Sequence, residues 1–421
     1  MTDIHDRLAE LKELGLYRRL RMVSGPQGPR VVLDGKPVLL LCSNNYLGLA
    51  DHPRVREAAA EAALRWGVGA GASRLVSGNM TIHRRLEERM AEFEGREACV
   101  LFGSGYLANT GVVAALAREG EVVFSDALNH ASLIDGCRLA RAETFVYDHL
   151  DTEHLAWGLE QARGRGALIV TDGVFSMDGD VAPLVEIVEL AREYDARIVV
   201  DEAHGTGAIG PGGRGVAAEA GLEEEIDVIV GTLGKALGSY GAYAACDSVM
   251  ARYLVNTARP LIFSTALPPP AVAGALAALD LLEEQPRRVR KLQVNADIVR
   301  GELEAAGYDV GGSSTQIVPM VIGDAETAMR VCEAALERGV FAQAIRPPTV
   351  PEGSSRLRLA VMASHTKSEL RAAVGELTRA AAAGGAHPRE QRKVPVPETA
   401  PIASSRVFDA EAREATVARA A

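Results

Sequence analysis

A regular alternation of short apolar runs and helical patterns between residues 98 and 230 constrains the fold of this chain more than any other feature. The apolar runs, rich in β-branched residues, are 98–102, 121–124, 144–147, 167–171, 197–200 and 227–230. The helical patterns between them are 106–118, 131–141, 154–162 and 183–195. Strands that alternate with helices form a mostly parallel sheet with helices on both of its faces. We therefore expect an α/β fold with a large, doubly wound sheet domain.

Polar residues follow several of these predicted strands. In a parallel sheet, ligands bind beyond the carboxyl ends of the strands, so these residues are candidates for chemistry. Taken one at a time, each is equally compatible with an ordinary helix cap or turn. They are Ser104 and Gly105 before a helix, Asp126, Asn129 and His130, Asp172 and Ser176, and Asp201 and His204.

Lys235 stands out in the segment 227–243, DVIVGTLGKALGSYGAY. The chain has six lysines, and Lys235 alone is flanked by glycine and small apolar residues. Burial disfavours the charged form of an amine and yields the neutral nucleophile that carbonyl chemistry requires. A glycine-rich loop whose lysine reaches solvent would give the same local sequence, so the polar strand ends decide the interpretation.

Together these residues meet the needs of pyridoxal 5'-phosphate (PLP). This cofactor requires a lysine for its aldehyde, a carboxylate at its ring nitrogen, a phosphate site and a group stacked on its ring. The residues that we assign to these roles are Lys235 for the aldehyde, Asp201 for the ring nitrogen, Gly105, Tyr106 and Thr232 for the phosphate, and His130 for stacking. Ser176 and His204 are placed to hydrogen-bond the phenolic oxygen of the cofactor.

Composition excludes several functional classes. A net charge of −11 and the lack of a basic stripe argue against a nucleic-acid partner, so local arginines must capture any anionic substrate. The five cysteines are scattered singly, which gives no metal site and fits a reducing compartment. The N-terminus is charged from its third residue, and no apolar run is long enough to cross a membrane. We expect a cytoplasmic protein with neither a metal nor a membrane partner.

The remaining segments predict four parts of the chain. Residues 1–48 hold an amphipathic helix over 3–20 and a hairpin of 30–34 with 37–41. The large cofactor-binding domain spans 49–285. A small C-terminal α/β domain follows over 286–383, with strands near 317–322 and 356–361 and helices over 326–338 and 367–382. Residues 384–421 are rich in proline and charge, and we expect a disordered tail.

The chain resembles the α-oxoamine synthase family of fold-type I PLP enzymes. The resemblance covers residues 18–377 and rests on long motifs rather than on single residues. The motifs are SNNYLGLA (43–50), SRLVSGN (73–79), LFGSGYLAN (101–109), LNHASLIDG (128–136), TDGVFSMDGDVAPL (171–184), VVDEAHGTGAIGPGGRG (199–215), GTLGKALG (231–238), FSTALPP (263–269) and AIRPPTVPEGSSRLRL (344–359). Glu202 is a conservative departure, because many members of the family have a second aspartate there.

The resemblance implies further site residues. It implies a homodimer with shared active sites, in which Ser264 or Thr265 reaches the cofactor phosphate of the neighbouring subunit. Arg21, which by itself would be a solvated helix-terminal charge, falls where the family contacts the acyl substrate. The other implied substrate contacts are Asn44 and Arg358 at the amino-acid carboxylate, Arg346 at a second anion, and Thr349.

Two arginines could serve the carboxylate, and strand periodicity does not separate them. Arg356 and Arg358 alternate with leucines, so both would lie on one face, and that face could equally be exposed to solvent. The resemblance favours Arg358 and leaves Arg356 open.

The RPPTVP motif favours members of the family that condense L-alanine with a pimeloyl thioester, carried by coenzyme A or by acyl carrier protein. In such a reaction Lys235 would remove the Cα proton, and His130 or His204 would assist loss of CO2. Relatives that use glycine or serine share the other motifs, among them 5-aminolevulinate synthase, 2-amino-3-ketobutyrate CoA ligase and serine palmitoyltransferase. A PLP-binding module without catalysis is a further alternative, against which the intact lysine, aspartate and histidines argue.

Overall fold

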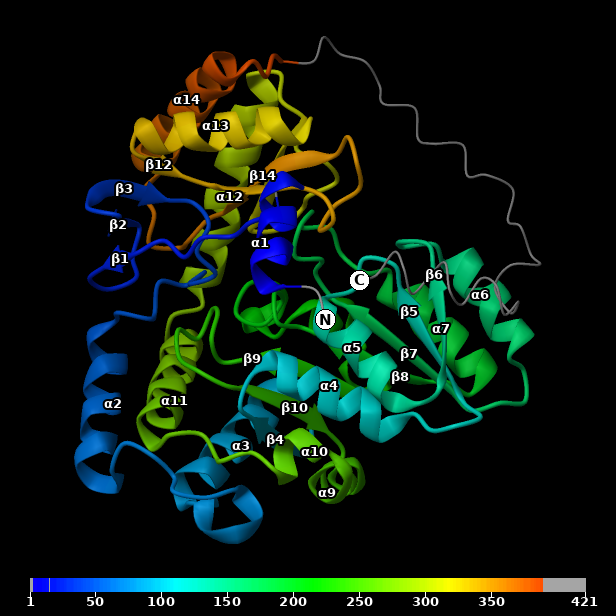
Figure 1. The fold of residues 1–421 in the computed structure, drawn as a ribbon. Helices are drawn as coiled ribbons and strands as arrows, with labels where there is room; N and C mark the ends of the chain where they lie inside the picture. The colour runs from blue at the N-terminus through cyan, green and yellow to red at the C-terminus, as the bar shows by residue number, and fades with distance from the viewer. Residues whose placement is uncertain (1–2, 15, 389–421) are drawn as a thin grey trace.

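A seven-stranded sheet forms the centre of the computed structural model, which describes residues 3–14 and 16–388 (Figure 1). The strand order is β4-β10-β9-β8-β7-β5-β6. All neighbours are parallel except β10, which is antiparallel to both β4 and β9. The strands are β4 Ala98–Phe102, β5 Val122–Asp126, β6 Glu143–Tyr147, β7 Ala167–Asp172, β8 Arg197–Asp201, β9 Val228–Thr232 and β10 Ala242–Cys246. The predicted doubly wound, mostly parallel sheet is confirmed.

Both faces of this sheet are buried, which explains why its strands read as unbroken apolar runs. Alternate residues of one strand enter different cores: Val199 lies in the cluster that includes α4, α5, α9 and α10, whereas Ile198 and Val200 lie in the cluster on the other face. The helices of this part are α2 Pro53–Trp66, α3 Thr81–Glu94, α4 Gly105–Leu116, α5 Ala131–Ala140, α6 Thr152–Gln161, α7 Leu184–Tyr194, α8 Val216–Ala220, α9 Ser248–Thr257, α10 Arg259–Ile262 and α11 Pro269–Glu284.

The C-terminal part lies above the large sheet in Figure 1 and contains a three-stranded antiparallel sheet of order β11-β14-β13. Its strands are β11 Ile317–Gly323, β13 Gln343–Ile345 and β14 Ser355–Ala360, and its helices are α12 Arg287–Ala305, α13 Ala325–Glu337 and α14 Lys367–Gly384. Strand β12 (Val340–Phe341) instead pairs with β3 (Lys36–Leu40), and so completes a second sheet with β1 (Val23–Ser24) and β2 (Arg30–Leu33). The N-terminal hairpin therefore shares a sheet with the C-terminal part.

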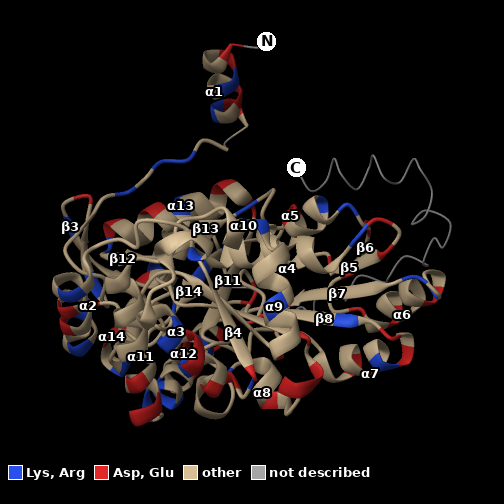
Figure 2. Ribbon diagram, turned by 90° about the horizontal axis from the view of Figure 1, so that it is seen from below, with Lys and Arg blue, Asp and Glu red and all other residues tan. Residues whose placement is uncertain are grey.

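The first helix is shorter than the sequence pattern predicts. Helix α1 spans Ile4–Glu13 and ends at Leu14, not near residue 20. Position 15 is a glycine, which costs roughly 1 kcal/mol relative to alanine in a helix interior, and α1 buries none of its side chains against the rest of the chain. Without packing there is nothing to offset that cost. Figure 2 shows α1 standing away from the other elements.

The structure leaves two expectations about domain organisation untested. The domain boundaries at residues 48, 285 and 383 stay predictions. Most of the predicted tail, residues 389–421, lies outside the described residues. Among the helices that are described, none combines the length and the apolar character needed to cross a bilayer.

Candidate active site

Lys235 lies in the turn that joins β9 to β10, with its side chain partly buried. Its Nζ is 2.8 Å from Nε2 of His204. Burial lowers the pKa of Lys235 from 10.5 to about 8, and the nearby Arg358 acts in the same direction against the opposing charges of Asp201 and Asp172. About a tenth of this amine is therefore neutral at pH 7, far more than for an ordinary lysine.

His204 connects Lys235 to a second group of polar residues. Its Nδ1 lies 2.6 Å from the hydroxyl of Tyr46, and this hydroxyl donates to Oδ1 of Asn44 at 3.2 Å. The backbone carbonyl of His204 accepts from Gln316 at 2.8 Å, which ties the loop to the C-terminal part. Burial, followed by the charges of Lys235 and Arg358, holds the pKa of His204 well below 6.5. His204 is therefore a neutral relay between Lys235 and Tyr46.

Asp201 ends β8, the strand beside β9, and is buried. Its Oδ2 accepts from Nδ2 of Asn109 at 2.5 Å, and its Oδ1 accepts from the backbone N–H of Ala203 at 2.8 Å. The same amide nitrogen of Asn109 also contacts the hydroxyl of Ser132 at 2.9 Å. The carboxylate is thus held in one orientation by a residue of α4. Asn109 lies within the motif 101–109 but was not among the predicted site residues.

Asp172 lies directly beside Asp201, because the two are register partners on β7 and β8. Burial, and then the charge of Asp201, raises the pKa of Asp172 well above 3.8. The Oδ2 of Asp172 accepts the backbone N–H of His130 at 2.6 Å. Two adjacent carboxylates repel, so the neutral form of Asp172 is favoured beside Asp201. The sequence placed Asp172 at a strand end without assigning it to the site.

His130 caps α5 and is exposed where the strands end. Its Nδ1 lies 2.7 Å from the hydroxyl of Ser132, the residue that Asn109 also contacts. Partial burial of the ring lowers the pKa of His130. The negative charge of Asp201 opposes this shift, and the positive charge of Lys235 adds to it. Ser132 contacts both His130 and Asn109, and Asn109 donates to Asp201, so these contacts link His130 to Asp201.

The N-terminus of α4 faces the same edge of the sheet. Ser104 caps this twelve-residue helix by accepting from the N–H of Leu107 at 3.3 Å. Apart from its chain neighbours and its own helix backbone, no atom of the described residues lies within 4 Å of where a side chain on Gly105 would begin. Open space at a helix N-terminus with free N–H groups suits a phosphate. Tyr106 is partly exposed, and its hydroxyl contacts Asp135. Thr232 donates its hydroxyl to the carbonyl of Gly241 at 3.1 Å.

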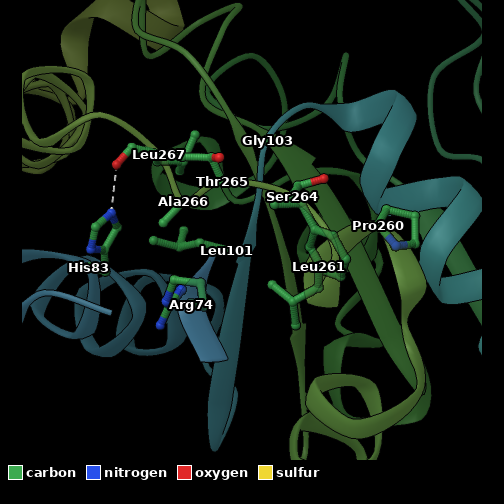
Figure 3. Close-up of a pocket in the computed structure, with 11 residues that line it drawn as sticks. Arg74, His83, Leu101, Gly103, Pro260, Leu261, Ser264, Thr265, Ala266 and Leu267 are labelled. Carbon is green, nitrogen blue, oxygen red and sulfur yellow. Dashed lines mark hydrogen bonds between the residues drawn. The ribbon is translucent and has the colours of Figure 1, made fainter. Parts of the chain in front are cut away.

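Ser264 and Thr265 line a cavity together with Gly103, two residues before Gly105, and with Arg74 and His83 (Figure 3). Thr265 forms a β-bridge with Ser73, and the N–H of Ala266 donates to Ala72 at 3.0 Å.

Arg358 and Arg356 are both buried, at 8% and 5% exposure, so the alternative of a solvent-facing pair is wrong. Arg358 donates its Nε to the carbonyl of Ser176 and approaches Oδ1 of Asn44 at 3.4 Å with both terminal nitrogens. Arg356 pairs with Asp178 in the same loop. Arg358 therefore meets Asn44, as the resemblance implied, and Arg356 holds the loop beside it.

Among the described residues, no hydrogen bond or ion pair joins three of the predicted substrate residues to this cluster. Arg21 pairs with Asp34 at 3.3 Å and with Glu333 at 3.5 Å. Arg346 and Thr349 occupy the turn after β13, where the N–H of Thr349 donates to the carbonyl of Arg346 at 3.1 Å. The fold brings together Lys235, His204, Asp201, His130, Ser176, Asn44 and Arg358, whereas Arg21, Arg346 and Thr349 have other partners.

The donor set fits PLP. A partly buried amine with a lowered pKa, an oriented carboxylate on the neighbouring strand and an open helix N-terminus occur at one sheet edge. These are the groups that the aldehyde, the ring nitrogen and the phosphate of the cofactor each require.

Comparisons with known proteins show the family to which this chain belongs. The aminotransferase class I and II family matches residues 36–377. The 8-amino-7-oxononanoate synthase of Geobacter sulfurreducens is 53% identical over 379 residues, covering 89% of this chain and 97% of that protein. A serine palmitoyltransferase from S. paucimobilis with a bound PLP-myriocin aldimine is 33% identical, with a TM-score of 0.86 over 91% of this chain and 97% of that one.

A further structural neighbour is the 8-amino-7-oxononanoate synthase of Francisella tularensis, 25% identical with a TM-score of 0.71 over 81% of this chain and 97% of that one. Its name agrees with that of the more similar curated relatives. The chain belongs to the PLP-dependent aminotransferase class I and II family and, within it, to the family of 8-amino-7-oxononanoate synthases.

Proposed function

We propose that this chain condenses L-alanine with a pimeloyl thioester, releasing 8-amino-7-oxononanoate, CO2 and the free thiol of coenzyme A or acyl carrier protein, in biotin biosynthesis. Relatives that are named 8-amino-7-oxononanoate synthase, and that are about half identical to this chain, support the assignment. The structural observation that carries it is one continuous set of contacts from Lys235 through His204, Tyr46 and Asn44 to Arg358. This set joins a candidate base to a candidate carboxylate receptor.

PLP, when bound, withdraws electrons from Cα of the amino acid and so acidifies its proton. Lys235 is the base in our proposal, since its lowered pKa supplies the neutral amine that can accept this proton. Neutral His204 keeps the amine in position by hydrogen bonding. Asp201, oriented by Asn109, is placed to hold a proton on the ring nitrogen.

Arg358 and Asn44 are our candidates for the carboxylate of alanine. A guanidinium pairs with both oxygens of a carboxylate, and Arg358 already points its two terminal nitrogens at Asn44. We assign Arg21 to the acyl substrate, Arg346 to a second anion and Thr349 to a further substrate contact. These three roles rest on family resemblance.

We infer a homodimer in which Ser264 or Thr265 of one subunit reaches the phosphate site of the other. Two exposed, large apolar side chains support an interface. Phe263, next to Ser264 in the sequence, is 71% exposed, and Tyr240, five residues after Lys235, is 56% exposed. Exposed apolar groups of this size are typical of surfaces that bury on association.

Serine palmitoyltransferase is the second candidate, because structures with that name match at a TM-score of 0.86. The test is CO2 release by purified protein with alanine, glycine or serine, each combined with pimeloyl and palmitoyl thioesters. We expect alanine with a pimeloyl thioester to give the highest kcat/KM. A preference for serine and palmitoyl thioester would move the assignment to the second candidate.

Lys235→Ala serves as the inactive reference in this test. It should lose both turnover and the visible absorbance of lysine-bound PLP. Lys291→Ala changes an exposed lysine on α12 and should retain both. Turnover by Lys235→Ala at the wild-type rate would show that Lys235 is not the base.

A further inference from the structure

His149 is clamped between two carboxylates near the site. Its Nδ1 lies 2.8 Å from Oδ1 of Asp126, and its Nε2 lies 2.7 Å from Oδ2 of Asp180. The ring packs edge-on against Phe175 at 4.4 Å. No step of the proposed reaction uses this triad, although it lies where β5, β6 and β7 end.

The contacts with two carboxylates favour a charged imidazole. A neutral imidazole has one N–H and can donate to one carboxylate, whereas the imidazolium donates to both. Burial alone would lower the pKa of His149, but the hydrogen bonds to Asp126 and Asp180 outweigh it and raise the pKa to about 9. His149 therefore carries two charge-assisted hydrogen bonds at neutral pH.

Each carboxylate anchors a loop that carries a predicted cofactor contact. Asp126 accepts the N–H groups of Leu128 at 2.8 Å and Leu150 at 3.0 Å, and His130 follows it by four residues. Asp126 therefore fixes the turn that leads from β5 to His130.

Asp180 closes the second loop, in which Ser176 lies four residues earlier. The N–H of Phe175 donates to the carbonyl of Asp180 at 3.0 Å, and Val174 and Val181 form a β-bridge across the base of the loop. The other side of the same loop is held by Arg358 at Ser176 and by Arg356 at Asp178.

We propose that His149 is a positioning residue for the cofactor site: as an imidazolium it joins the loop of His130 to the loop of Ser176 and fixes the separation of these two PLP contacts. This inference rests on the proposed roles of His130 and Ser176. Its direct consequence is that removal of His149 weakens PLP binding although His149 itself does not contact the cofactor.

The experiment compares wild type, His149→Ala, Asp180→Asn and the double variant by PLP dissociation constant and by visible circular dichroism of the bound cofactor. Loss of a charge-assisted hydrogen bond is expected to raise the dissociation constant of His149→Ala roughly tenfold and to weaken its visible signal. Asp180→Asn should show a smaller change in the same direction. The double variant should match His149→Ala within about twofold, because both changes break the same link.

Leu303→Ala is the matched control for lost stability. It removes a fully buried side chain of α12, outside both loops, and should lower Tm while leaving the PLP dissociation constant unchanged. An unchanged dissociation constant in His149→Ala, or an equal rise in Leu303→Ala, would overturn the proposal. Wild type that fails to bind PLP would instead overturn the proposed function.

A pH series gives a second readout. The ratio of the dissociation constants of His149→Ala and wild type should shrink as pH rises through about 9, where His149 loses its proton. Titration of Lys235 affects both proteins and cancels in this ratio. Asp126 and Asp180 contact His149 directly, and Tyr147 and Asp172 lie beside Asp126. Asp148, on the adjoining loop, pairs with His154 of α6. A ratio that stays constant up to pH 10 would contradict the role of the charge.

Discussion

The Nζ atom of Lys235 lies 2.8 Å from Nε2 of His204, and the two residues come from loops that follow neighbouring strands. With the pKa of His204 well below 6.5, its Nε2 can accept a proton donated by Lys235 while its Nδ1 faces Tyr46. The contact therefore orients the amine without adding a positive charge. This arrangement makes the protonation state of Lys235 the variable to test first.

The apoprotein should capture PLP covalently at a rate that rises as pH passes through about 8. The pKa of Lys235 is lowered to about 8, so about half of its amines are neutral there, against less than about 1% for an ordinary lysine at 10.5. Rapid mixing of apoprotein with PLP, followed by visible absorbance, measures this rate. A midpoint near 10.5 would contradict the lowered pKa.

Arg358→Gln provides a check on the cause of that shift. Burial is the main cause of the low pKa of Lys235, and the positive charge of Arg358 lowers this pKa further, by a smaller amount. Its removal should therefore move the midpoint of PLP capture to higher pH, while Arg371→Gln, an exposed change on α14, should leave the midpoint in place.

Asn109→Ala should lower kcat about tenfold, because it removes the amide that orients Asp201 and leaves one oxygen of a buried carboxylate without that donor. Steady-state kinetics with saturating PLP measures the change. Asn256→Ala, which removes an exposed amide bonded within α9, is the control and should retain the wild-type kcat. Equal kcat values in both variants would show that Asp201 needs no support from α4.

The two buried arginines of β14 should separate kinetically. Arg358→Gln should raise the KM for the amino acid roughly tenfold or more, because a bidentate partner for its carboxylate is lost. Arg356→Gln breaks the pair with Asp178 and should chiefly lower stability, by about 2–4 kcal/mol. Denaturant unfolding and steady-state kinetics on both variants test this, and the reverse pattern would exchange their roles.

Glu202→Gln should stabilise the protein at pH 8 by about 2 kcal/mol and leave it nearly unchanged at pH 5. Burial raises the pKa of Glu202 from 4.5 to about 7, and its Oε2 is buried without a hydrogen-bond partner among the described residues. A raised pKa means that the folded state binds the proton more tightly. The stabilisation from that proton is complete below pH 4.5 and is lost as pH rises through about 7.

Glutamine mimics the protonated side chain at every pH and keeps the acceptor for the N–H of Ala217. Denaturant unfolding of wild type and Glu202→Gln at pH 5 and pH 8 measures the difference. An equal free-energy change at both pH values would show that ionisation of Glu202 is not its source.

Much of the site was predictable because its residues sit at strand ends. The runs that end near Phe102, Asp126, Asp172 and Asp201 gave the strands within about two residues, and parallel strands bring their carboxyl ends to one edge. Lys235 was predictable as the reactive amine because its neighbours in the sequence are glycine and small apolar residues. Asn109 was missed because it lies inside a helix, where its amide looks like any other polar residue until Asp201, 92 positions away, is placed against it.

The sequence by itself determined the doubly wound sheet, since strands buried on both faces must be continuously apolar and their connections must be helical. Only the tertiary structure decided what each polar side chain meets. It inserted β10 antiparallel between β4 and β9, buried Arg356 and Arg358 against the loop of Ser176, and enclosed His149 between Asp126 and Asp180. Periodicity records which face a residue takes, but the partner on that face comes from distant parts of the chain and is fixed only by packing.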